Sequence, residues 1–427
     1  MPKCSALPST LIKVCILHHG NLGEIKPVSK RDFPQKDNDL RPITLTAILS
    51  KCLERVGLHL LMPYVRTLLD PMRFAYLSNR CTTDAICTLS HLVTRHLDCK
   101  SSNTARALFI DFSSAFNTMQ PHKLLQKLHM YKVPAYLRRW ILDYLLDRPQ
   151  YVKTKYETSE KITLRTGAPQ VCVLSPVLFI IYTNDMTWNS GTTHIVKYAD
   201  DTAIIGLITN DNDKDYVDCI NFVNQWCHHN YLDLNVTKTK ELLWDFRRNF
   251  HVTPTPVVID DLSVEVVKFY KYLGLYLDDQ LNFQKHVITQ LKKANKRVYC
   301  LRMMRKLNVD SKIIVLFYNA TIVSVLMYAA ASFYGVLTKQ YCNMLCKPYR
   351  TCKRLLSLDL QAKLDNNTDI YSAQLKQLAQ KILIDARHPL YNNFVLLPSG
   401  RRLRVPKIRT NRFRNNFVPR VINILNV

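Results

Sequence analysis

Glycine is scarce in this sequence, and the shortage excludes several kinds of site. The 427 residues include only 9 glycines, against a usual share of about 7%. Binding loops built from closely spaced glycines are therefore not expected, and neither are flexible glycine-rich linkers. The composition favours a helix-rich body, and 47% hydrophobic residues are enough for two or three packed domains.

Acidic residues are also in short supply. Lys and Arg total 59 and Asp and Glu total 33, which gives a formal net charge of +26. A surplus of this size suits a polyanionic partner, nucleic acid first and an acidic membrane surface second. A merely soluble basic protein is the alternative, but +26 lies too far from zero to prefer it.

The cysteines lack the pattern of a disulfide framework. Their number is odd, 13, and no pairs recur at short fixed spacing, so a reducing intracellular compartment is favoured. The two densest clusters are Cys342 with Cys346 and Cys352, and Cys219 with Cys227, His228 and His229. Neither has a known zinc spacing, and buried or incidental thiols are the preferred interpretation.

No secretory leader is visible, because residues 10–17 are few, carry Lys13 and lack a cleavage site. Residues 313–337 contain no charged side chain and are long enough to span a bilayer. The stretch also contains Asn319, Thr321 and three tyrosines. We predict a buried helix followed by a short apolar strand, with a membrane anchor over 313–337 as the remote alternative.

The most informative motif is the sequence YADD at 198–201, which lies between the apolar runs 193–197 and 202–206. Asp200 and Asp201 at a tight turn between strands predict a metal-binding hairpin, although Asp favours turns for backbone reasons alone. A third carboxylate, Asp111, ends the run RALFI, which predicts a buried strand. Three such acids brought to one point can hold two Mg²⁺ ions for in-line nucleotidyl transfer.

The rest of the chain alternates predicted helices and strands without an internal repeat. Helices are predicted over 47–69, 82–97, 122–128, 135–146, 176–185, 213–230 and 283–307, and strands over 40–45, 151–166 (a hairpin), 242–246 and 257–271. Residues 1–40 look irregular and basic, 101–104 form a polar turn, and Thr82 or Thr83 is the expected N-cap of its helix. The predicted fold class is α+β.

Residues 401–420 carry eight basic side chains and no acidic one. The basic residues are Arg401, Arg402, Arg404, Lys407, Arg409, Arg412, Arg414 and Arg420. Phe413 and Phe417 interleave with them, a mixture that suits phosphate contact together with base stacking. A solvated charged face or an import signal is the alternative.

Six segments, in order, resemble the reverse transcriptase of LINE-type, non-LTR retrotransposons. They are LRPITLTAILSKCLERV (40–56), NRCTTDAI (79–86), ALFIDFSSAFNTM (107–119), TGAPQVCVLSPVLFIIYTND (166–185), YADDTAIIG (198–206) and LDLNVTKTKELL (232–243). Residues 269–286 resemble the family's primer-grip region, and 388–402 with 409–420 resemble the end of jockey- and chicken-repeat-type elements. The resemblance extends over about 24–427. Group II intron maturases and telomerase-like enzymes share the palm chemistry, but FSSAFNT and TGAPQ favour the LINE family.

The resemblance implies an RNA-directed DNA polymerase with a right-hand fold of fingers, a palm with a small antiparallel sheet, and a helical thumb. The implied domains are 1–104 (N-terminal extension and fingers), 105–260 (palm with finger insertions), 261–345 (primer grip and thumb) and 346–427 (basic nucleic-acid-binding region). The implied partners are an RNA template, a DNA primer or target, and dNTPs. No small-molecule cofactor and no membrane are expected, the compartment is nuclear, cytoplasmic or both, and the oligomeric state is left open.

The resemblance also assigns the catalytic roles. Asp111 and Asp200 would bind two Mg²⁺ ions, for which Mn²⁺ is a possible substitute, and the carbonyl of Phe112 would complete one metal's shell. Asp201 would be the adjacent, less central carboxylate. One metal lowers the pKa of the primer 3′-hydroxyl and the other neutralises the triphosphate and the leaving pyrophosphate.

Further residues are assigned to the nucleotide and the primer. Lys30 and Arg41 would hold the incoming triphosphate, and Gln170 would line the nucleotide and template pocket. Phe116 would be the steric gate against a ribose 2′-hydroxyl, with a core phenylalanine as the alternative. Lys238 would protonate the leaving pyrophosphate or be a surface lysine. Arg80 would contact the template or brace the fingers, and the primer grip would contain Tyr272, Leu273 and Gly274.

The sequence departs from the family pattern in several places. Val171 stands where the family has Gly after Pro-Gln, and Leu77 and Ser78 also differ. If that glycine serves a positive φ, valine costs of the order of 1–3 kcal/mol. No endonuclease region precedes the polymerase segments, so we expect a truncated genomic copy. A catalytically decayed remnant that only binds nucleic acid is therefore an alternative function.

Overall fold

The computed structural model describes residues 23–30, 32–35, 39–99, 103–247, 255–355 and 366–426. The chain divides into two units, and each is assembled from separate stretches of sequence. The first unit contains Met1–Asp70, Asp111–Thr187 and Asn221–Asn235, and the second contains Pro71–Ile110, Trp188–Ile220 and Val236–Val427. Both units contain helices and strands, which confirms the predicted α+β class.

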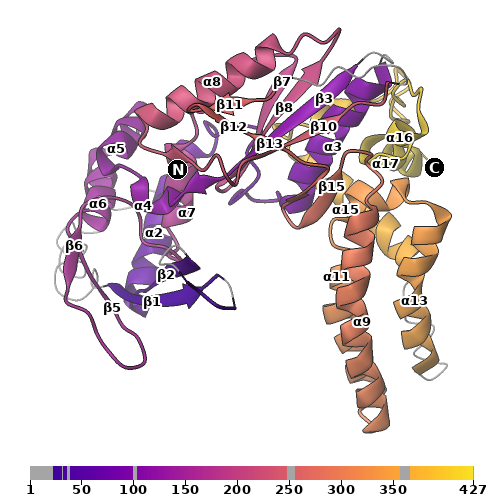
Figure 1. Ribbon diagram of the computed structural model, residues 1–427, viewed down its shortest axis with the longest axis horizontal. Coiled ribbons are helices and arrows are strands. Elements are labelled where there is room, and N and C mark those ends of the chain that lie inside the picture. The colour runs from indigo at the N-terminus through magenta and orange to yellow at the C-terminus, as the bar shows by residue number, and fades with distance from the viewer. Residues whose placement is uncertain are drawn as a thin grey trace. The chain divides into compact units, whose positions relative to one another are not determined.

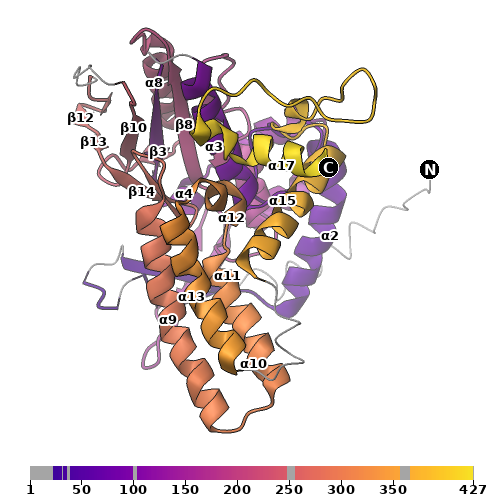
Figure 2. The ribbon, with the colours of Figure 1, turned by 90° about the vertical axis from the view of Figure 1, so that its right-hand side faces the viewer.

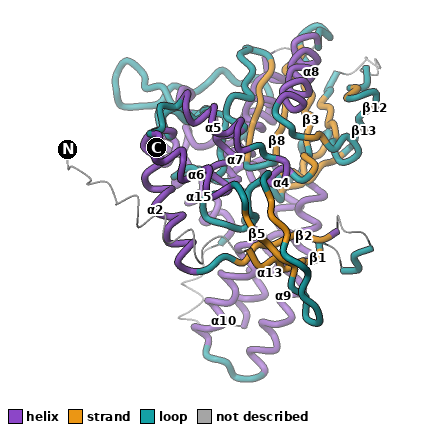
Figure 3. Tube along the Cα trace, turned by 90° about the vertical axis from the view of Figure 1, so that its left-hand side faces the viewer, coloured by secondary structure: helices purple, strands orange, loops and turns teal. Residues whose placement is uncertain are grey.

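The first unit contains a four-stranded sheet in the order β2-β1-β5-β6, of which β1, β2 and β5 are labelled in Figure 3. Its strands are β1 (Gly23–Ser29), β2 (Leu40–Leu45), β5 (Arg148–Val152) and β6 (Ile162–Leu164). The predicted strand 40–45 and the hairpin over 151–166 are confirmed, since β1 pairs with β2 and β5 pairs with β6. The irregular structure predicted for 1–40 is wrong for β1, because its partners β2 and β5 lie outside that local stretch. Residues 1–22, 31 and 36–38 lie outside the described residues.

Helices complete the first unit. They are α2 (Ile48–Val65), α4 (Ala115–Thr118), α5 (Pro121–Met130), α6 (Ala135–Leu145) and α7 (Ser175–Tyr182), and the short strands β4 (Phe112–Ser113) and β9 (Asp233–Leu234) pair with each other. Pro134 precedes α6 and Pro176 lies in the first turn of α7, where a missing N–H costs no helical hydrogen bond. Leu178, Phe179 and Tyr182 of α7 are fully buried, and α7 packs on α5 in the core of this unit.

The second unit contains a five-stranded sheet in the order β13-β10-β3-β8-β7 (Figure 1). Its strands are β3 (Thr104–Ile110), β7 (Thr193–Tyr198), β8 (Asp201–Ile208), β10 (Lys240–Trp244) and β13 (Glu265–Val266). β3 is central and every residue in it is buried. The predicted strand before Asp111 and the predicted hairpin around YADD are both confirmed. The polar turn predicted at 101–104 lies largely outside the described residues, and Thr104 already belongs to β3.

A buried ionic network lies on one face of this sheet. The Arg106 guanidinium, 1% exposed, donates two hydrogen bonds of 2.7 and 2.9 Å to Glu241 and one of 2.7 Å to Asp213. The Tyr216 hydroxyl also donates to Glu241, at 2.8 Å. Burial alone would lower the pKa of Arg106, but the hydrogen bonds and charge of Glu241 raise it. Removing one partner of such a buried pair typically costs about 3–5 kcal/mol, so this network fixes the register of β3 against β10.

Helix α3 (Thr82–Cys99) covers the other face of the sheet. It packs on β3, β7 and β8 and also contacts α12, α16 and α17. The helix begins at Thr82, so the prediction of Thr82 or Thr83 as the N-cap is one or two residues late. The Cys81 N–H precedes the helix and donates to the Asp84 carboxylate at 2.7 Å.

Polar side chains seven residues apart on α3 hold the C-terminal stretch. Asp84 lies 3.4 Å from the His388 ring nitrogen, and the His91 ring nitrogen lies 3.1 Å from the Asn393 carboxamide oxygen. Further along, Asp98 accepts a hydrogen bond of 2.6 Å from the Thr410 hydroxyl. Because a spacing of seven returns to the same helix face, one face of α3 contacts three successive parts of residues 388–410.

The remaining elements of the second unit are mostly helical. They are β11 (Val258–Ile259), β12 (Leu262–Ser263), β14 (Phe269–Tyr272), β15 (Leu275–Asp278), α9 (Gln284–Lys306), α10 (Ser311–Phe317), the π-helix η2 (Tyr318–Val323), α11 (Ser324–Leu326), α12 (Ala330–Phe333), the 3₁₀ helices η3 (Tyr334–Val336) and η4 (Tyr391–Asn393), α13 (Lys339–Leu355), α15 (Asn367–Ile384), α16 (Asn411–Arg414) and α17 (Phe417–Leu425). Helices α9 and α13 lie side by side (Figures 1 and 2). Helix α8 (Lys214–His229) belongs partly to each unit.

The apolar segment 313–337 is helical in short pieces, and the strand predicted at its end is wrong. The chain turns at Ala329, which has φ +55°, and resumes as α12 and η3. Ile314, Tyr318 and Ile322 are fully buried in the protein core. Among the described residues, no single helix has the length and apolarity to cross a membrane, although Ser311–Leu326 and Ala330–Val336, bent by 41°, meet these criteria as a pair.

The seating of the C-terminal stretch on α3 predicts a pH-dependent stability. Burial, with the nearby Arg95 charge, lowers the pKa of His91 to about 4, below the usual value of about 6.5. The unfolded chain then binds more protons, so stability is full above pH 6.5 and falls as pH decreases toward 4. By urea denaturation, His91→Gln should reduce the loss between pH 6.5 and 5 by about 2 kcal/mol, at about 1.4 kcal/mol per pH unit.

The buried His286, whose pKa is also lowered to about 4 by burial, provides a parallel measurement. His286→Gln should reduce the loss of stability over the same pH range as His91→Gln does. An unchanged slope in His91→Gln would contradict the assignment.

Candidate functional site

The YADD hairpin carries its two carboxylates on a tight turn. Tyr198 pairs with Asp201, which leaves Ala199 and Asp200 as a two-residue loop. Ala199 has φ +55° while Asp200 does not have a positive φ, the combination of a type II′ turn, which usually has glycine at the first position. Alanine in this conformation stores of the order of 1–3 kcal/mol of strain.

The sheet register shows which residues of β8 lie opposite the end of β3 that leads into Asp111. β3 and β8 are antiparallel, with Phe109 opposite Ala203 and Ile110 opposite Thr202 as the last pair. Asp111 is bonded to Ile110, and Asp201 precedes Thr202. Since side chains alternate between the faces of a strand, Asp201 belongs to the face that carries Phe109 and Ala203.

An unpaired hydroxyl lies on this face of the sheet. The Tyr272 ring is 5.2 Å from the Phe109 ring, and its hydroxyl is buried with no hydrogen-bond partner. Burial raises the pKa of Tyr272, and the charge of Asp201 raises it further. Buried polar groups are nearly always satisfied, and this hydroxyl is one of several exceptions among the described residues.

The donor chemistry here suits a divalent cation. Aspartate oxygens are the hard ligands that Mg²⁺ prefers, Asp111 is partly exposed, and Asp200 and Asp201 are exposed. Phe112, assigned a carbonyl role, begins β4 and pairs with Leu234. Across the residues that the structure describes, no group of three or more His, Cys, Asp or Glu side chains is gathered closely enough to hold a metal ion.

Hydrogen bonds in the first unit connect three segments that carry predicted nucleotide-binding residues. The Gln170 carbonyl accepts from the Thr44 N–H at 3.3 Å, and its carboxamide donates to the Asn117 side chain at 3.2 Å. The Phe116 carbonyl accepts from the Ala168 N–H at 2.7 Å. The strand that carries Arg41, the loop 166–171 and helix α4 are thereby fixed to one another.

Other predicted nucleotide contacts are placed only in part. The Phe116 ring lies 4.9 Å from the core residue Phe179 and is partly exposed, so the structure is compatible with both the gate and the core interpretation. Lys30, Arg41 and Lys238 are exposed, and these assignments stay predictions.

Two positions in the loop 166–171 have a positive φ. At Gly167, with φ +71°, a Cβ atom would lie 2.6 Å from the Asn117 carbonyl oxygen, so only glycine fits. Val171 has φ +67° and is 68% exposed. The strain predicted for a valine at this position is therefore present, because left-handed backbone is least favourable for a β-branched residue.

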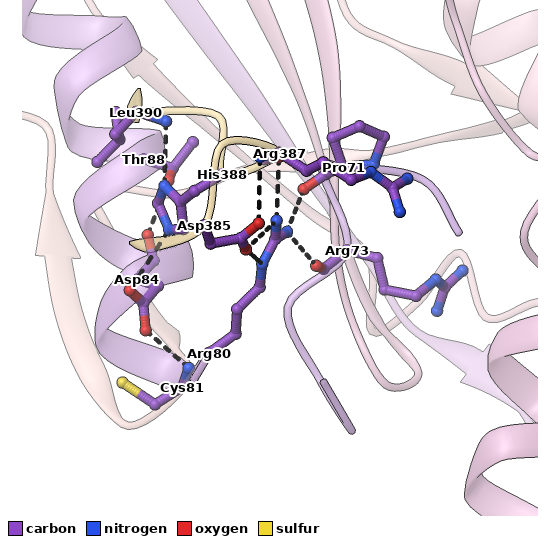
Figure 4. A network of polar contacts seen from close by, with 10 residues as sticks. All are labelled: Pro71, Arg73, Arg80, Cys81, Asp84, Thr88, Asp385, Arg387, His388 and Leu390. Atoms are coloured by element: carbon purple, nitrogen blue, oxygen red, sulfur yellow. Dashed lines mark hydrogen bonds and ion pairs between the residues drawn. The ribbon is translucent and has the colours of Figure 1, made fainter. Parts of the chain in front are cut away.

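Arg80 makes a saturated network inside the second unit (Figure 4). Its guanidinium donates twice to Asp385, at 2.8 and 3.0 Å, and also to the carbonyls of Pro71, Arg73 and Arg387. All five N–H groups are thus used, and the side chain is 4% exposed. These contacts join Arg80 to residues 71–73 and 385–387 of the second unit, and both roles predicted for Arg80, template contact and bracing of the fingers, stay predictions.

The second pair in Figure 4 joins Asp84 to His388. The His388 ring accepts a hydrogen bond of 3.1 Å from the Leu390 N–H, and Thr88 donates to the Asp84 carbonyl at 2.8 Å. Sequence analysis did not identify Asp84, Asp385 or His388. The available signal for Asp84 and His388 was that they lie in two segments, NRCTTDAI and the stretch beginning at residue 388, that resemble the same family.

The predicted primer-grip residues form the turn between β14 and β15. Leu273 and Gly274 have φ +45° and +88°, as in a type I′ hairpin turn. The Tyr328 hydroxyl lies 2.5 Å from the Leu273 carbonyl oxygen and 2.8 Å from the Thr82 hydroxyl. The turn is therefore held against α3 and the segment that follows α11.

The basic C-terminal segment is folded into the second unit. Most of its basic side chains are exposed, namely Arg401, Arg402, Arg404, Lys407, Arg409 and Arg414. Arg412 instead covers the Phe246 ring at 3.4 Å. Phe413 and Phe417 are 2% and 0% exposed, so the predicted stacking of these two rings on bases is wrong, because they pack in the core.

Comparison with known proteins gives matches to two different family models and to several curated relatives. Residues 29–277 match the family model "Reverse transcriptase (RNA-dependent DNA polymerase)", and residues 287–324 match "Alkylated DNA repair protein alkB homolog 8, N-terminal". The chain is 25% identical to "Probable RNA-directed DNA polymerase from transposon X-element" of Drosophila melanogaster, over 74% of this chain and 36% of the relative. It is 24% identical to the "Retrovirus-related Pol polyprotein from type-1 retrotransposable element R1" of Bradysia coprophila, over 74% and 31%.

A third relative is the "RNA-directed DNA polymerase from mobile element jockey" of Drosophila melanogaster, 23% identical over 73% of this chain and 34% of the relative. The chain thus spans about a third of the length of these curated relatives. Among solved structures, apo telomerase from Candida Tropicalis is similar, with a TM-score of 0.45, 11% identity, and coverage of 86% of this chain and 68% of that one. A TM-score this low does not establish a shared fold.

Val171→Gly should stabilise the chain. Glycine removes the cost of left-handed backbone, of the order of 1–2 kcal/mol. It also raises the conformational entropy of the unfolded chain, which offsets part of this gain. We therefore expect the free energy of unfolding, measured by urea denaturation, to rise by about 0.5–1 kcal/mol. The matched control is Val152→Gly in strand β5, where glycine weakens a strand and stability should fall. Destabilisation by Val171→Gly would contradict the strain at this position.

Arg80→Met should destabilise the second unit by about 3 kcal/mol, because it leaves Asp385 without its partner. The double variant Arg80→Met/Asp385→Leu should recover part of this loss, as measured by denaturation in a double-mutant cycle. If Arg80 contacts the template instead, Arg80→Met would keep the parent's stability and lose RNA affinity.

Proposed function

Because the chain belongs to the reverse transcriptase (RNA-dependent DNA polymerase) family, we propose that it copies retrotransposon RNA into DNA from a primer 3′-hydroxyl. The observation that carries the proposal is the placement of Asp200 and Asp201 on the β7–β8 turn, next to the end of β3 from which the chain continues into Asp111. Acidic residues in this arrangement suit nucleotidyl transfer.

Asp111 and Asp200, with the Phe112 carbonyl, would hold two Mg²⁺ ions. When bound, the ions would lower the pKa of the 3′-hydroxyl and neutralise the triphosphate and pyrophosphate. Asp201 adds negative charge beside Asp200, and the buried Tyr272 hydroxyl supplies a hydrogen-bond donor on the same sheet face. The turn that carries both carboxylates has a positive φ at Ala199, a backbone strain of a kind that recurs at functional sites.

The first unit supplies the residues that would select the nucleotide. Arg41 and Lys30 are exposed cations that would bind the triphosphate, and Gln170 would contact the base pair from its loop. The Phe116 ring would exclude a ribose 2′-hydroxyl by steric collision. The hydrogen bond from the Ala168 N–H to the Phe116 carbonyl fixes the backbone of Phe116 against that loop. Lys238, which belongs to the second unit, would give a proton to the departing pyrophosphate.

Basic surface in the second unit would bind the template and primer. Helix α9 contains eight basic residues and no acidic one, and its exposed Tyr299 lies on the stripe that includes Lys292 and Lys296. Arg401 and Arg402 are exposed in the C-terminal segment. Cations beside an exposed aromatic suit phosphate contact with base stacking. Nuclear or cytoplasmic localisation, the absence of a membrane partner and the domain bounds stay predictions.

A decayed polymerase that only binds nucleic acid is the second candidate. The positive φ of Val171 favours it, because a bulky strained residue follows Gln170 directly, and distortion there would disturb the loop that faces the nucleotide. The charge of +26 would preserve nucleic-acid binding in such a remnant.

Incorporation of dNTPs on a primed RNA template with Mg²⁺ tests the first candidate. Asp111→Asn and Asp200→Asn should each lower the rate by roughly a thousandfold, about 4 kcal/mol, because an amide is a poorer metal ligand than a carboxylate. Asp218→Asn, a substitution of the exposed Asp218 on α8, should keep the parent's rate.

RNA affinity measured on the same samples separates the two candidates. If the parent chain binds the template without incorporating dNTPs, and Val171→Gly restores incorporation, the chain is a decayed polymerase with a sound scaffold. Equal incorporation by the parent and Asp200→Asn would overturn the carboxylate site.

A further inference from the structure

A cavity of about 370 Å³ lies within the second unit, away from the YADD turn in sequence. One wall is the start of α3, with Cys81 and Thr83. A second is the segment from Asn319 to Ala331, and a third is one face of α15, which packs against α12 (Figure 2). None of the roles described above uses this cavity.

Helix α15 presents a polar stripe to the cavity. Gln374, Gln377 and Lys381 line it, at a spacing of three and four residues that lies on one helix face. The Gln374 carboxamide donates to the Met327 carbonyl at 3.2 Å, which holds that side chain at the wall. Lys376 and Gln380 on the same helix are exposed and do not line the cavity.

The lining combines one cation, several amides and apolar surface. Among the described residues that form the walls there is no acidic side chain, and Lys381 is the basic one. Asn319, Gln374 and Gln377 offer both donors and acceptors, as recognition of a base edge requires. Apolar side chains such as Met327 and Leu378 suit the face of a base.

The backbone of the second wall has two unusual features. Tyr318–Val323 is a π-helix, and Ala329 is buried with φ +55°. Both kinds of feature recur at functional sites. They favour a binding role for this wall over simple helix packing.

The cavity is also connected to the predicted primer grip. Tyr328 lines the cavity, and its hydroxyl lies within hydrogen-bond distance of the Leu273 carbonyl and the Thr82 hydroxyl. The Tyr328 ring lies 3.1 Å from the position that a Cβ on Gly274 would take. An occupant that moved Tyr328 would therefore press on the β14–β15 turn.

We propose that this cavity binds one unpaired nucleotide of a single-stranded nucleic acid, with the base against Met327 and Leu378 and a phosphate at Lys381. The proposal rests on the nucleic-acid binding in the proposed function. The volume lies in the range of about 300–1,000 Å³ that small ligands occupy, which suits one nucleotide and is too small for a stretch of duplex. A strand held here would be fixed beside the turn that grips the primer.

Photocrosslinking of the full chain to a short single-stranded RNA with 4-thiouridine tests the proposal, without dNTPs or Mg²⁺. Crosslinked peptides from 319–331 should be found by mass spectrometry. Gln374→Leu/Lys381→Met should lower their yield at least about tenfold, the effect of losing roughly 1.4 kcal/mol or more of phosphate and base-edge contact. Lys376→Met/Gln380→Leu, the same exchanges on the exposed face of α15, should keep it.

Competition arms separate the sources of the nucleotide. Unlabelled single-stranded RNA should compete better than a free nucleoside monophosphate, whereas the reverse order would overturn the strand-bound form of the proposal. Absence of crosslinks to 319–331, or an equal yield in both double variants, would overturn the site itself. Because the assay needs no polymerisation, crosslinking by a chain that fails to extend a primer would reject the polymerase function and keep this site.

Discussion

The guanidinium of Arg106 is the constraint on which the second unit depends. A charge with 1% exposure has no water to solvate it, so its partners must come from the protein. Glu241 on β10, Asp213 before α8 and the Thr255 carbonyl provide them, and each is thereby held against β3. The strand that carries Arg106 ends one residue before Asp111. A slip of one residue in its register would turn every side chain to the opposite face, so the same buried charge also fixes the face on which the site can form.

Helix α3 extends this order from the sheet to the C-terminal stretch. Its buried polar face contacts His388, Asn393 and Thr410 in turn, and Arg80, just before it, donates three of its five hydrogen bonds to the 385–387 turn. The region after 346, predicted from the sequence as a basic nucleic-acid-binding region, is thus packed into the second unit. Its apolar rings serve the core while most of its cations stay in solvent, so one segment can stabilise the unit and still offer charge to nucleic acid.

Local patterns predicted the local structure well. The run before Asp111, the YADD hairpin and the helix over 82–97 follow from periodicity alone, and the right-hand polymerase fold implied by the ordered motifs is confirmed by the family match over 29–277. Features that depend on distant partners were missed. The pairing of β1 with β5, the Arg80–Asp385 ion pair and the burial of Phe413 all depend on residues far apart in sequence. The strand predicted after the apolar helix failed because the break at Ala329 has no periodic signature. For the site, the strain at Val171 was anticipated from a missing glycine, whereas the orphaned Tyr272 hydroxyl had no sequence signal.

The interleaving of the two units has a consequence for biosynthesis. The chain passes between the units five times, and Arg80 and Asp385 are separated by 305 residues. A ribosome that has released α3 must add almost the whole remaining chain before the partners of that helix exist. Until then the side of α3 that the C-terminal stretch covers is open to solvent, which favours aggregation or chaperone binding. The second unit can therefore close only late in synthesis, and a chain that stops early would leave that side of α3 uncovered.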